Sequence, residues 1–215
     1  MTKIKICGIQ TLEDALFAAN AGADMLGFNF VRNNPHAIDK EEARTLCIAL
    51  RDKLGDKCPI LIGVFVNELV SNISAVTNFV GLNAAQLNGD ESDVMLKELR
   101  GTGFKGVQPF NKAMALDDVK YYSKFLTEDE KLPSFVLDPY HKSVPNQETS
   151  VEIALAVKAE VPRMMLAGTF TLESLAENIK AIQPWGIDIV EDIALEGKPE
   201  HDKIKAFIDA VKSIE

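Results

Sequence analysis

The chain has 215 residues, of which 47% are hydrophobic and 26% charged. This balance is typical of a globular protein with a sizeable core and excludes a disordered chain. The formal net charge of −9, with no run of Lys or Arg, argues against general binding to nucleic acid or to anionic membranes. No apolar stretch reaches the roughly 18 residues that a membrane helix needs, and the amino terminus lacks the apolar region of a signal peptide.

The sequence contains three cysteines, Cys7, Cys47 and Cys58. An odd number without CxxC spacing favours neither a disulfide framework nor a zinc site. We therefore expect a cytoplasmic protein without a metal site. The sequence has no glycine-rich dinucleotide or nucleotide loop, so we expect no cofactor.

The first stretch of the chain predicts a strand, a tight turn and a helix. Apolar and charged residues alternate over 4–6, which is typical of a strand. Cys7 and Gly8 stand where that strand should end. Thr11 is the predicted N-cap of an amphipathic helix over 12–21, which has acidic residues in its first turn.

The same unit repeats to the end of the chain. Seven further strands are predicted, over 25–30, 60–66, 82–87, 104–107, 134–137, 163–166 and 187–190. Helices are predicted after them, ending near residues 53, 78, 100, 126, 158, 182 and 214. Asp39 and Thr171 are the predicted N-caps of the helices that end near 53 and 182. The turn at 88–90 should open the helix that ends near 100, and the helix that ends near 126 should start at Leu116.

Eight alternating units imply parallel strands joined by right-handed crossovers. At this length they predict an α/β fold, a single (β/α)8 TIM barrel, in one domain over residues 1–215. An open doubly wound sheet is the alternative, but it usually has fewer strands.

In such a barrel the chemistry lies in the loops that follow the strands. Cys7 ends the first predicted strand and Asp138 ends the sixth. Taken alone, Cys7 could be a small buried residue and Asp138 a turn former ahead of Pro139. Their shared position at the ends of strands favours a functional role for both. The other positions to consider are 31–38, 67, 88–91, 108, 168–170 and 191–196.

Short motifs along the whole chain carry a resemblance to a known family. They are KICGI at 5–9, EDA at 13–15, AGAD at 21–24, GVFVN at 63–67, QLNGDE at 86–91, LAG at 166–168, LAENI at 175–179, GID at 186–188 and KIKAFI at 203–208. In these motifs the chain resembles phosphoribosylanthranilate isomerase of tryptophan biosynthesis.

The resemblance implies an acid–base isomerisation in which a ring-closed ribosylamine, an aminoaldose, opens and becomes an aminoketose. It also implies that Cys7 acts as general base and Asp138 as general acid. One group must protonate the ring oxygen and the other must remove the proton from sugar C2, each within hydrogen-bond reach. A thiolate can serve as the base only if its pKa is lowered by a helix end or a neighbouring cation.

The chain departs from the family at the loop after the second strand. The family has a Ser-Pro-Arg run whose arginine binds the aromatic carboxylate of the substrate, whereas this chain has Asn34, Pro35 and His36. A histidine is a single, pH-dependent donor, while a guanidinium can bind two oxygens at once. Arg32 could take the role of the missing arginine. The alternative for His36 is an exposed loop histidine.

The phosphate-binding loops depart as well. The loop after Asp138 contains no glycine, although glycines let backbone amides approach a phosphate. Gly168 is followed by Thr169, and the carboxylates of Glu191 and Asp192 replace small neutral residues after the eighth strand. Like charges repel, so weak binding of a phosphorylated substrate is expected. The alternative is that the two carboxylates point outward and the phosphate pocket persists in altered form.

The candidate substrate-binding residues share positions in these loops: Arg32, His36, Asn88, Gly168, Thr169, Glu191 and Asp192. Three functions remain open. The first is the family isomerisation. The second is other chemistry in a diverged relative, with Asp138, Glu191, Asp192 and His141 binding a cation or a polyhydroxyl ligand. The third is a non-catalytic binding barrel. In each case we expect a small-molecule ligand and a monomer or homodimer.

Overall fold

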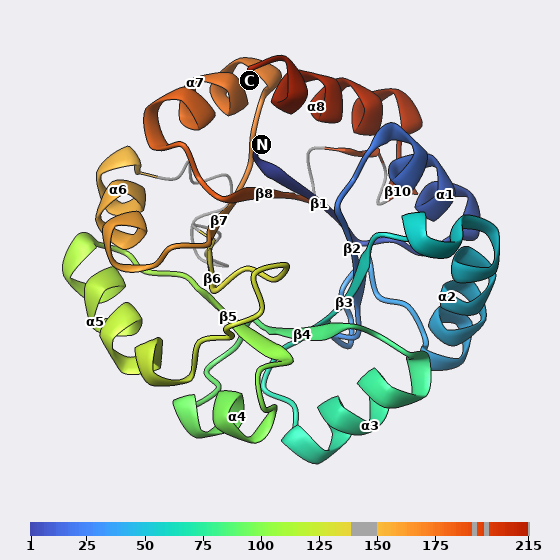
Figure 1. Ribbon diagram of the computed structural model, residues 1–215, viewed down its shortest axis with the longest axis horizontal. Coiled ribbons are helices and arrows are strands. Elements are labelled where there is room, and N and C mark those ends of the chain that lie inside the picture. The colour runs from blue at the N-terminus through green and yellow to red at the C-terminus, as the bar shows by residue number, and fades with distance from the viewer. Residues whose placement is uncertain (139–149, 191–192, 196–197, 215) are drawn as a thin grey trace.

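The computed structural model describes residues 1–138, 150–190, 193–195 and 198–214. Its eight main strands are parallel and form a closed barrel in sequence order, as Figure 1 shows in a view along the barrel. The strands are β1 (Lys3–Cys7), β2 (Met25–Asn29), β3 (Ile60–Phe65), β4 (Ala84–Leu87), β5 (Gly103–Val107), β6 (Phe135–Leu137), β7 (Met164–Ala167) and β8 (Gly186–Ile189). The predicted (β/α)8 barrel is confirmed.

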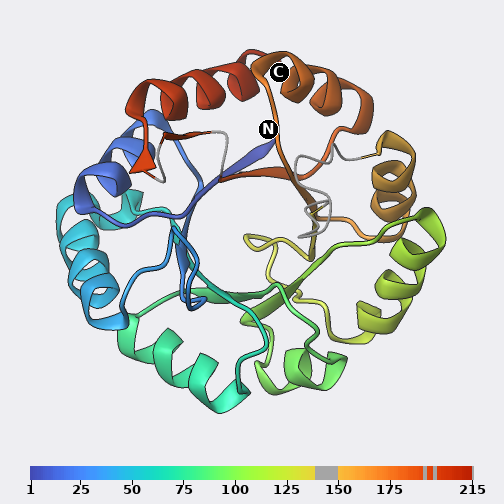
Figure 2. The same ribbon diagram turned by 180° about the vertical axis from the view of Figure 1, so that it is seen from behind.

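The helices form a ring outside the strands, seen from both ends of the barrel in Figures 1 and 2. They are α1 (Leu12–Ala21), α2 (Lys40–Leu54), α3 (Val70–Val80), α4 (Asp93–Glu98), α5 (Lys112–Tyr122), α6 (Val151–Glu160), α7 (Leu172–Ile182) and α8 (His201–Ser213). Two short 3-10 helices, η1 (Gly55–Lys57) and η2 (Ser123–Phe125), extend α2 and α5. An antiparallel pair, β9 (Ala194–Leu195) and β10 (Lys198–Pro199), precedes α8 and was not predicted.

Three of the predicted helix caps are confirmed by side-chain hydrogen bonds. Thr11 accepts from the amide of Asp14 at the start of α1, and Asp39 caps α2. Thr171 and Ser174 form a reciprocal capping box at the start of α7. Each such cap stabilises its helix by about 1 kcal/mol, which fixes where the chain leaves the preceding loop.

Two helix boundaries differ from the prediction. α4 starts only at Asp93, because the carboxylate of Glu91 accepts the backbone N–H groups of Asn67 and Gly89 and holds residues 88–91 as a loop. α5 starts at Lys112, four residues earlier than predicted. Its N-cap is Asn111, whose side chain accepts the amide of Met114.

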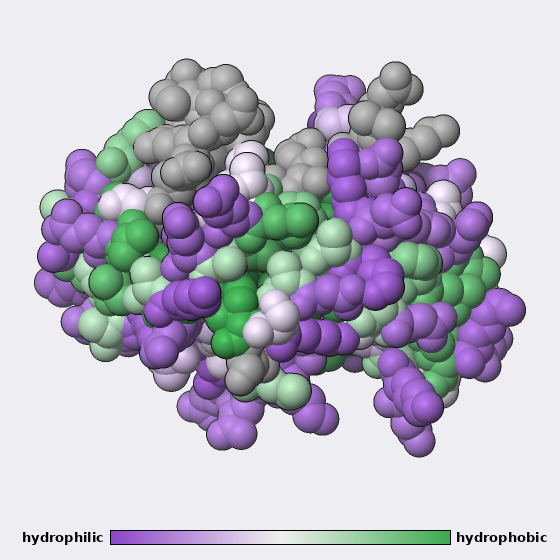
Figure 3. All heavy atoms as spheres, turned by 90° about the horizontal axis from the view of Figure 1, so that it is seen from above, coloured by the Kyte–Doolittle hydropathy of each residue, from purple (hydrophilic) through white to green (hydrophobic). Residues whose placement is uncertain are grey.

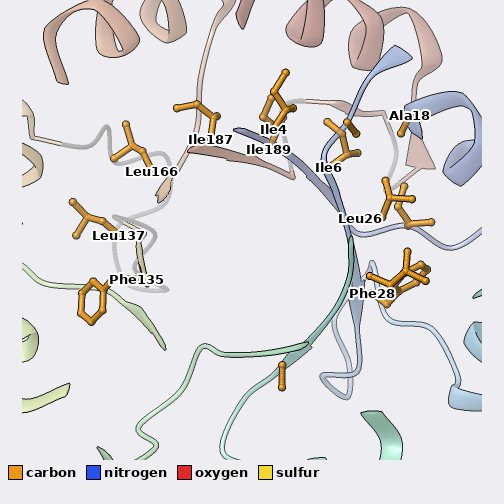
Figure 4. Close-up of a cluster of buried hydrophobic side chains, with 14 of the residues drawn as sticks. Ile4, Ile6, Ala18, Leu26, Phe28, Phe135, Leu137, Leu166, Ile187 and Ile189 are labelled. Carbon is orange, nitrogen blue, oxygen red and sulfur yellow. The ribbon is translucent and has the colours of Figure 1, made fainter. Parts of the chain in front are cut away.

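Side chains alternate between two hydrophobic regions along each strand. One face points toward the helices, and Figure 4 shows Ile6, Phe28 and Leu166 among the side chains that lie on this outer side of the barrel wall. The other face fills the inside of the barrel with a smaller apolar cluster: Met25, Ile62, Ala84, Phe104, Leu132, Val136, Met165 and Ala167. This inner cluster forms a floor beneath the polar residues near the carboxyl ends of the strands.

The outer surface is mainly polar. Figure 3 shows hydrophilic side chains spread over the side of the barrel, with smaller hydrophobic patches between them. Within the described parts of the chain, no helix is both long and apolar enough to cross a membrane.

Candidate active site

Cys7 and Asp138 lie at the same end of the barrel. Cys7 is the last residue of β1, and Asp138 directly follows β6. Because all eight strands are parallel, both residues lie on the carboxyl-terminal face, where barrel enzymes place their chemistry. As expected from the sequence, Cys7 and Asp138 therefore lie at the ends of their strands on the same face of the barrel.

The thiol of Cys7 lies inside the barrel wall against β2. Cys7 pairs with Gly27 in the parallel register, and a Cβ atom added to Gly27 would lie 2.4 Å from the Cys7 sulfur. The residue is 5% exposed. Gly27 therefore provides the space that the thiol occupies.

Replacing Gly27 by alanine should displace the thiol and lower kcat by roughly tenfold to 10²-fold, since a shift of about 1 Å at a reacting group can cost that much. The matched control is Gly63→Ala, because a Cβ there would meet Leu82 and Phe65 at 2.7 and 2.8 Å instead of the thiol. Both variants should lower the thermal midpoint. If Gly27→Ala keeps wild-type kcat, the position assigned to the thiol is wrong.

A buried ion pair lies beside Cys7. The Lys5 ammonium and the Asp188 Oδ2 atom are 2.7 Å apart, and their side chains are 0% and 3% exposed. Lys5 pairs with Asp188 in the β1–β8 register. Within the described residues, the second carboxylate oxygen of Asp188, Oδ1, has no hydrogen-bond partner. Because a buried acceptor without a partner is costly, this oxygen is a candidate contact for a substrate donor.

Opposing effects act on the Cys7 thiol. Burial raises its pKa, the Lys5 ammonium lowers it, and Asp188 raises it; the net direction is upward from the ordinary value. The pKa of Lys5 is also raised: burial lowers it, but the charges of Asp188 and Cys7 outweigh that effect. Lys5 thus stays protonated and is the cation that stabilises a Cys7 thiolate.

Asp138 is held by amide side chains from two neighbouring strands. Its Oδ2 atom lies 3.3 Å from Nε2 of Gln108 and 3.5 Å from Nδ2 of Asn88. Asn88 in turn accepts a 3.1 Å hydrogen bond from Gln86 at its Oδ1 atom. These neutral donors hold the carboxyl group in place without adding a charge.

His36 and Arg32 occupy different environments. His36 is only 2% exposed, so the alternative of an exposed loop histidine is wrong. A Cβ added to Gly8 would lie 3.1 Å from Cβ and Cγ of His36, which places the histidine directly behind the turn that follows Cys7. Arg32 is exposed.

The candidate residues after β7 are partly buried. Gly168 has φ +138°, a conformation that favours glycine. Thr169 is half-buried, and Phe170 is 4% exposed within the core between barrel and helices. Glu191, Asp192 and His141, together with the rest of 139–149, lie outside the described residues.

Three polar groups inside the barrel were not expected from the sequence: Lys5, Asp188 and Gln86. The signal for Lys5 was its spacing, because residues two apart on a strand share a face and Lys5 therefore faces the same way as Cys7. The same parity places Gln86 beside Asn88. In the described parts of the chain, no group of three or more His, Cys, Asp or Glu side chains is placed to hold a metal ion.

A closed parallel barrel with a thiol, a carboxyl group and amide donors at its carboxyl-terminal face is the arrangement of a small-molecule enzyme of the (β/α)8 class. The sequence model of the N-(5'-phosphoribosyl)anthranilate (PRA) isomerase family matches residues 4–210. The N-(5'-phosphoribosyl)anthranilate isomerase of Chlorobaculum tepidum is 34% identical over 219 residues, which cover 99% of this chain and 96% of that protein.

Two solved structures agree. One describes monomers generated from the dimeric phosphoribosylanthranilate isomerase of Thermotoga maritima, with a TM-score of 0.83, 30% identity and coverage of 99% of this chain and 100% of that one. The other is a phosphoribosylanthranilate isomerase in complex with reduced 1-(o-carboxyphenylamino)-1-deoxyribulose 5-phosphate, with a TM-score of 0.82, 29% identity and the same coverage.

This chain belongs to the N-(5'-phosphoribosyl)anthranilate isomerase family. The resemblance seen in the sequence motifs is confirmed. These similarities favour the family isomerisation over a diverged barrel with other chemistry or a non-catalytic one.

Proposed function

We propose that this protein isomerises N-(5'-phosphoribosyl)anthranilate to the corresponding aminoketose, with Cys7 as general base and Asp138 as general acid. Membership of the isomerase family over residues 4–210 supports the reaction. The observation that carries the assignment of roles is the buried thiol beside Lys5, at the same end of the barrel as Asp138.

The reaction needs two proton transfers and no net change in oxidation state. Asp138 donates a proton to the ring oxygen, the C–O bond breaks, and the nitrogen lone pair forms the C=N bond of an open-chain iminium ion, which keeps its N–H proton. The Cys7 thiolate then removes the proton from C2, and the electron pair gives an enolamine that tautomerises to the ketone. Each transfer by a positioned group accelerates its step by roughly 10²–10⁴-fold.

The cation beside the thiol supports this role in part. Burial and Asp188 hold the pKa of Cys7 above its ordinary value, and Lys5 opposes them, so more thiolate forms than would form without the ammonium. Oδ1 of Asp188, which has no hydrogen-bond partner among the described residues, is the candidate acceptor for a donor of the substrate, and His36 is the candidate contact for its carboxylate. We propose Arg32, Asn88, Gly168, Thr169, Glu191 and Asp192 as further binding residues.

We further propose that residues 1–215 act as one domain in the cytoplasm, as a monomer or homodimer. The dimeric enzyme of Thermotoga maritima supports considering the dimer. The weak phosphate binding expected from the altered loops stays a prediction. Calorimetric titration with ribose 5-phosphate checks it, and micromolar affinity would contradict it.

Replacing Lys5 by methionine should move the pH dependence of kcat/KM. The rate rises with pH as Cys7 loses its proton, and Lys5 lowers the pKa of that thiol. Removing the ammonium should therefore shift the rising limb about 1–3 pH units upward, the range of an opposite charge at contact distance. Because the pKa of Cys7 already lies above its ordinary value, the shift appears between pH 6 and 10 as a kcat/KM about 10–10³-fold lower than that of the wild type at each pH.

A lone Asp188 carboxylate would also destabilise the fold, by about 3–5 kcal/mol. The paired variant Lys5→Met with Asp188→Asn avoids that charge and should show a smaller upward shift, because Asp188 itself raises the pKa of Cys7. Unchanged profiles in both variants would contradict the role given to Lys5.

A growth test examines the function as a whole. The gene should restore growth without tryptophan to an auxotroph that lacks the isomerase, and the Cys7→Ser variant should fail. Rescue by neither, with both proteins present in folded form, would contradict the proposed function.

A further inference from the structure

A second buried ion pair lies on the helix side of the barrel wall. The Lys105 ammonium is 3.2 Å from Oε2 of Glu91, and the two side chains are 2% and 0% exposed. The ring of Tyr122 covers the ammonium at 5.6 Å. A buried ion pair can often be replaced by apolar residues without loss of stability. Stability alone therefore does not account for this pair.

The lysine holds the backbone on both sides of Asn88. Its ammonium donates to the carbonyl of Leu87 at 3.2 Å and to the carbonyl of Gly89 at 2.6 Å. A third hydrogen bond, 2.7 Å long, goes to the carbonyl of Gly106, the next residue of the lysine's own strand, β5. One charged group therefore fixes the peptide units that flank Asn88 and ties them to β5.

The glutamate holds the same segment from its other side. Oε2 of Glu91 accepts the amide of Gly89, and Oε1 accepts the amide of Asn67, both at 2.8 Å. Asn67 in turn accepts the amide of Asp90 at its side-chain oxygen, at 2.7 Å. The loop after β4 is thus joined to the loop after β3.

Inside the barrel, the side chain of Asn88 fills a notch made by Gly106. A Cβ atom on Gly106 would lie 1.9 Å from Oδ1 of Asn88. The amide nitrogen of Asn88 faces Oδ2 of Asp138. Lys105 and Gly106 are adjacent residues of β5. Lys105 holds the backbone around Asn88 from outside the barrel, and Gly106 leaves room for the Asn88 side chain inside it.

We propose that the Lys105–Glu91 pair is a positioning device for the general acid: it fixes Asn88, and Asn88 with Gln108 fixes Asp138. This inference rests on the proposed role of Asp138. Both amide donors go to Oδ2 of Asp138.

The paired substitution Lys105→Met with Glu91→Gln removes both charges and leaves no lone buried ion. It should fold and lower kcat on the order of tenfold to 10²-fold, a larger change than the rise in KM that displacement of Asn88 brings. The matched control is Tyr122→Phe, which removes the hydrogen bond to the carbonyl of Glu91 but none that holds Asn88. This control should lose stability and keep kcat. Should the paired variant not fold, Glu91→Asp keeps the charges, shortens the reach of the carboxylate and should lower kcat in the same way.

A double-mutant cycle separates positioning from a general loss of stability. Asn88→Ala alone should lower kcat about as much as the paired variant, and adding the pair substitution to it should lower kcat no further. If the two effects multiply, the pair does not act through Asn88 and the proposal is overturned.

A measurement that needs no substrate distinguishes a failure of this proposal from a failure of the proposed isomerase function. The side-chain amide resonances of Asn88 in 15N-labelled protein should move in the paired variant and stay in place in Tyr122→Phe. Unmoved resonances in the paired variant would overturn the proposal even if the wild type is an active isomerase. An inactive wild type in which they move would contradict the proposed function and leave the positioning of Asn88 supported.

Discussion

Replacing Cys7 by serine is expected to lower kcat by about 10²–10⁴-fold, the range for loss of a positioned base. A hydroxyl is far less acidic than a thiol and makes a poor base without a helper. Lys5 can stabilise a thiolate beside it, but an alkoxide would form only at much higher pH. Steady-state kinetics on purified, folded variant measure the loss.

Cys47→Ser is the matched control. Cys47 is also buried, and burial raises its pKa to about 12, but it lies on α2 outside the barrel. Its substitution should cost some stability and leave kcat unchanged. Wild-type turnover in Cys7→Ser would show that another group is the base.

Replacing Asp138 by asparagine should lower kcat by a similar factor, about 10²–10⁴-fold, because an amide has no transferable proton for the ring oxygen. The shape of the side chain is kept, so KM should change little. The kinetic constants and the thermal midpoint, measured together, separate a chemical loss from a folding defect.

Asp129→Asn is the control for removing a carboxylate near β6. Asp129 is exposed, in the loop that leads into the strand, and its carboxylate accepts the amide of Lys131. This variant should keep kcat. An Asp138→Asn protein as active as the wild type would rule out Asp138 as the acid.

Local patterns were enough to predict the barrel. The alternation around β1 and the caps at Thr11, Asp39 and Thr171 depend on neighbouring residues, and they placed the elements correctly. The late start of α4 could not be predicted this way. It depends on the carboxylate of Glu91 bonding to the amide of Asn67, 24 positions earlier in the chain.

The residues of the candidate site likewise fall into two groups: those that local sequence patterns predict, and those whose partners lie far away in the chain. Cys7 and Asp138 stand at strand ends, so the rule that places chemistry at the carboxyl ends of barrel strands selects them. The partner of Lys5 is 183 positions away at Asp188. Only closure of β8 against β1 brings the two together, and a single lysine in an alternating strand equally indicates an exposed face. The burial of His36 likewise depends on the turn at Gly8.

The central claim is that this barrel isomerises N-(5'-phosphoribosyl)anthranilate through Cys7 and Asp138. The most direct measurement is to supply that compound to the purified protein and follow its conversion by NMR, with Cys7→Ser and Asp138→Asn in parallel. We predict that the aminoketose forms with the wild type, and at rates about 10²–10⁴-fold lower with each variant. No conversion by the folded wild type, or equal conversion by all three proteins, would contradict the account.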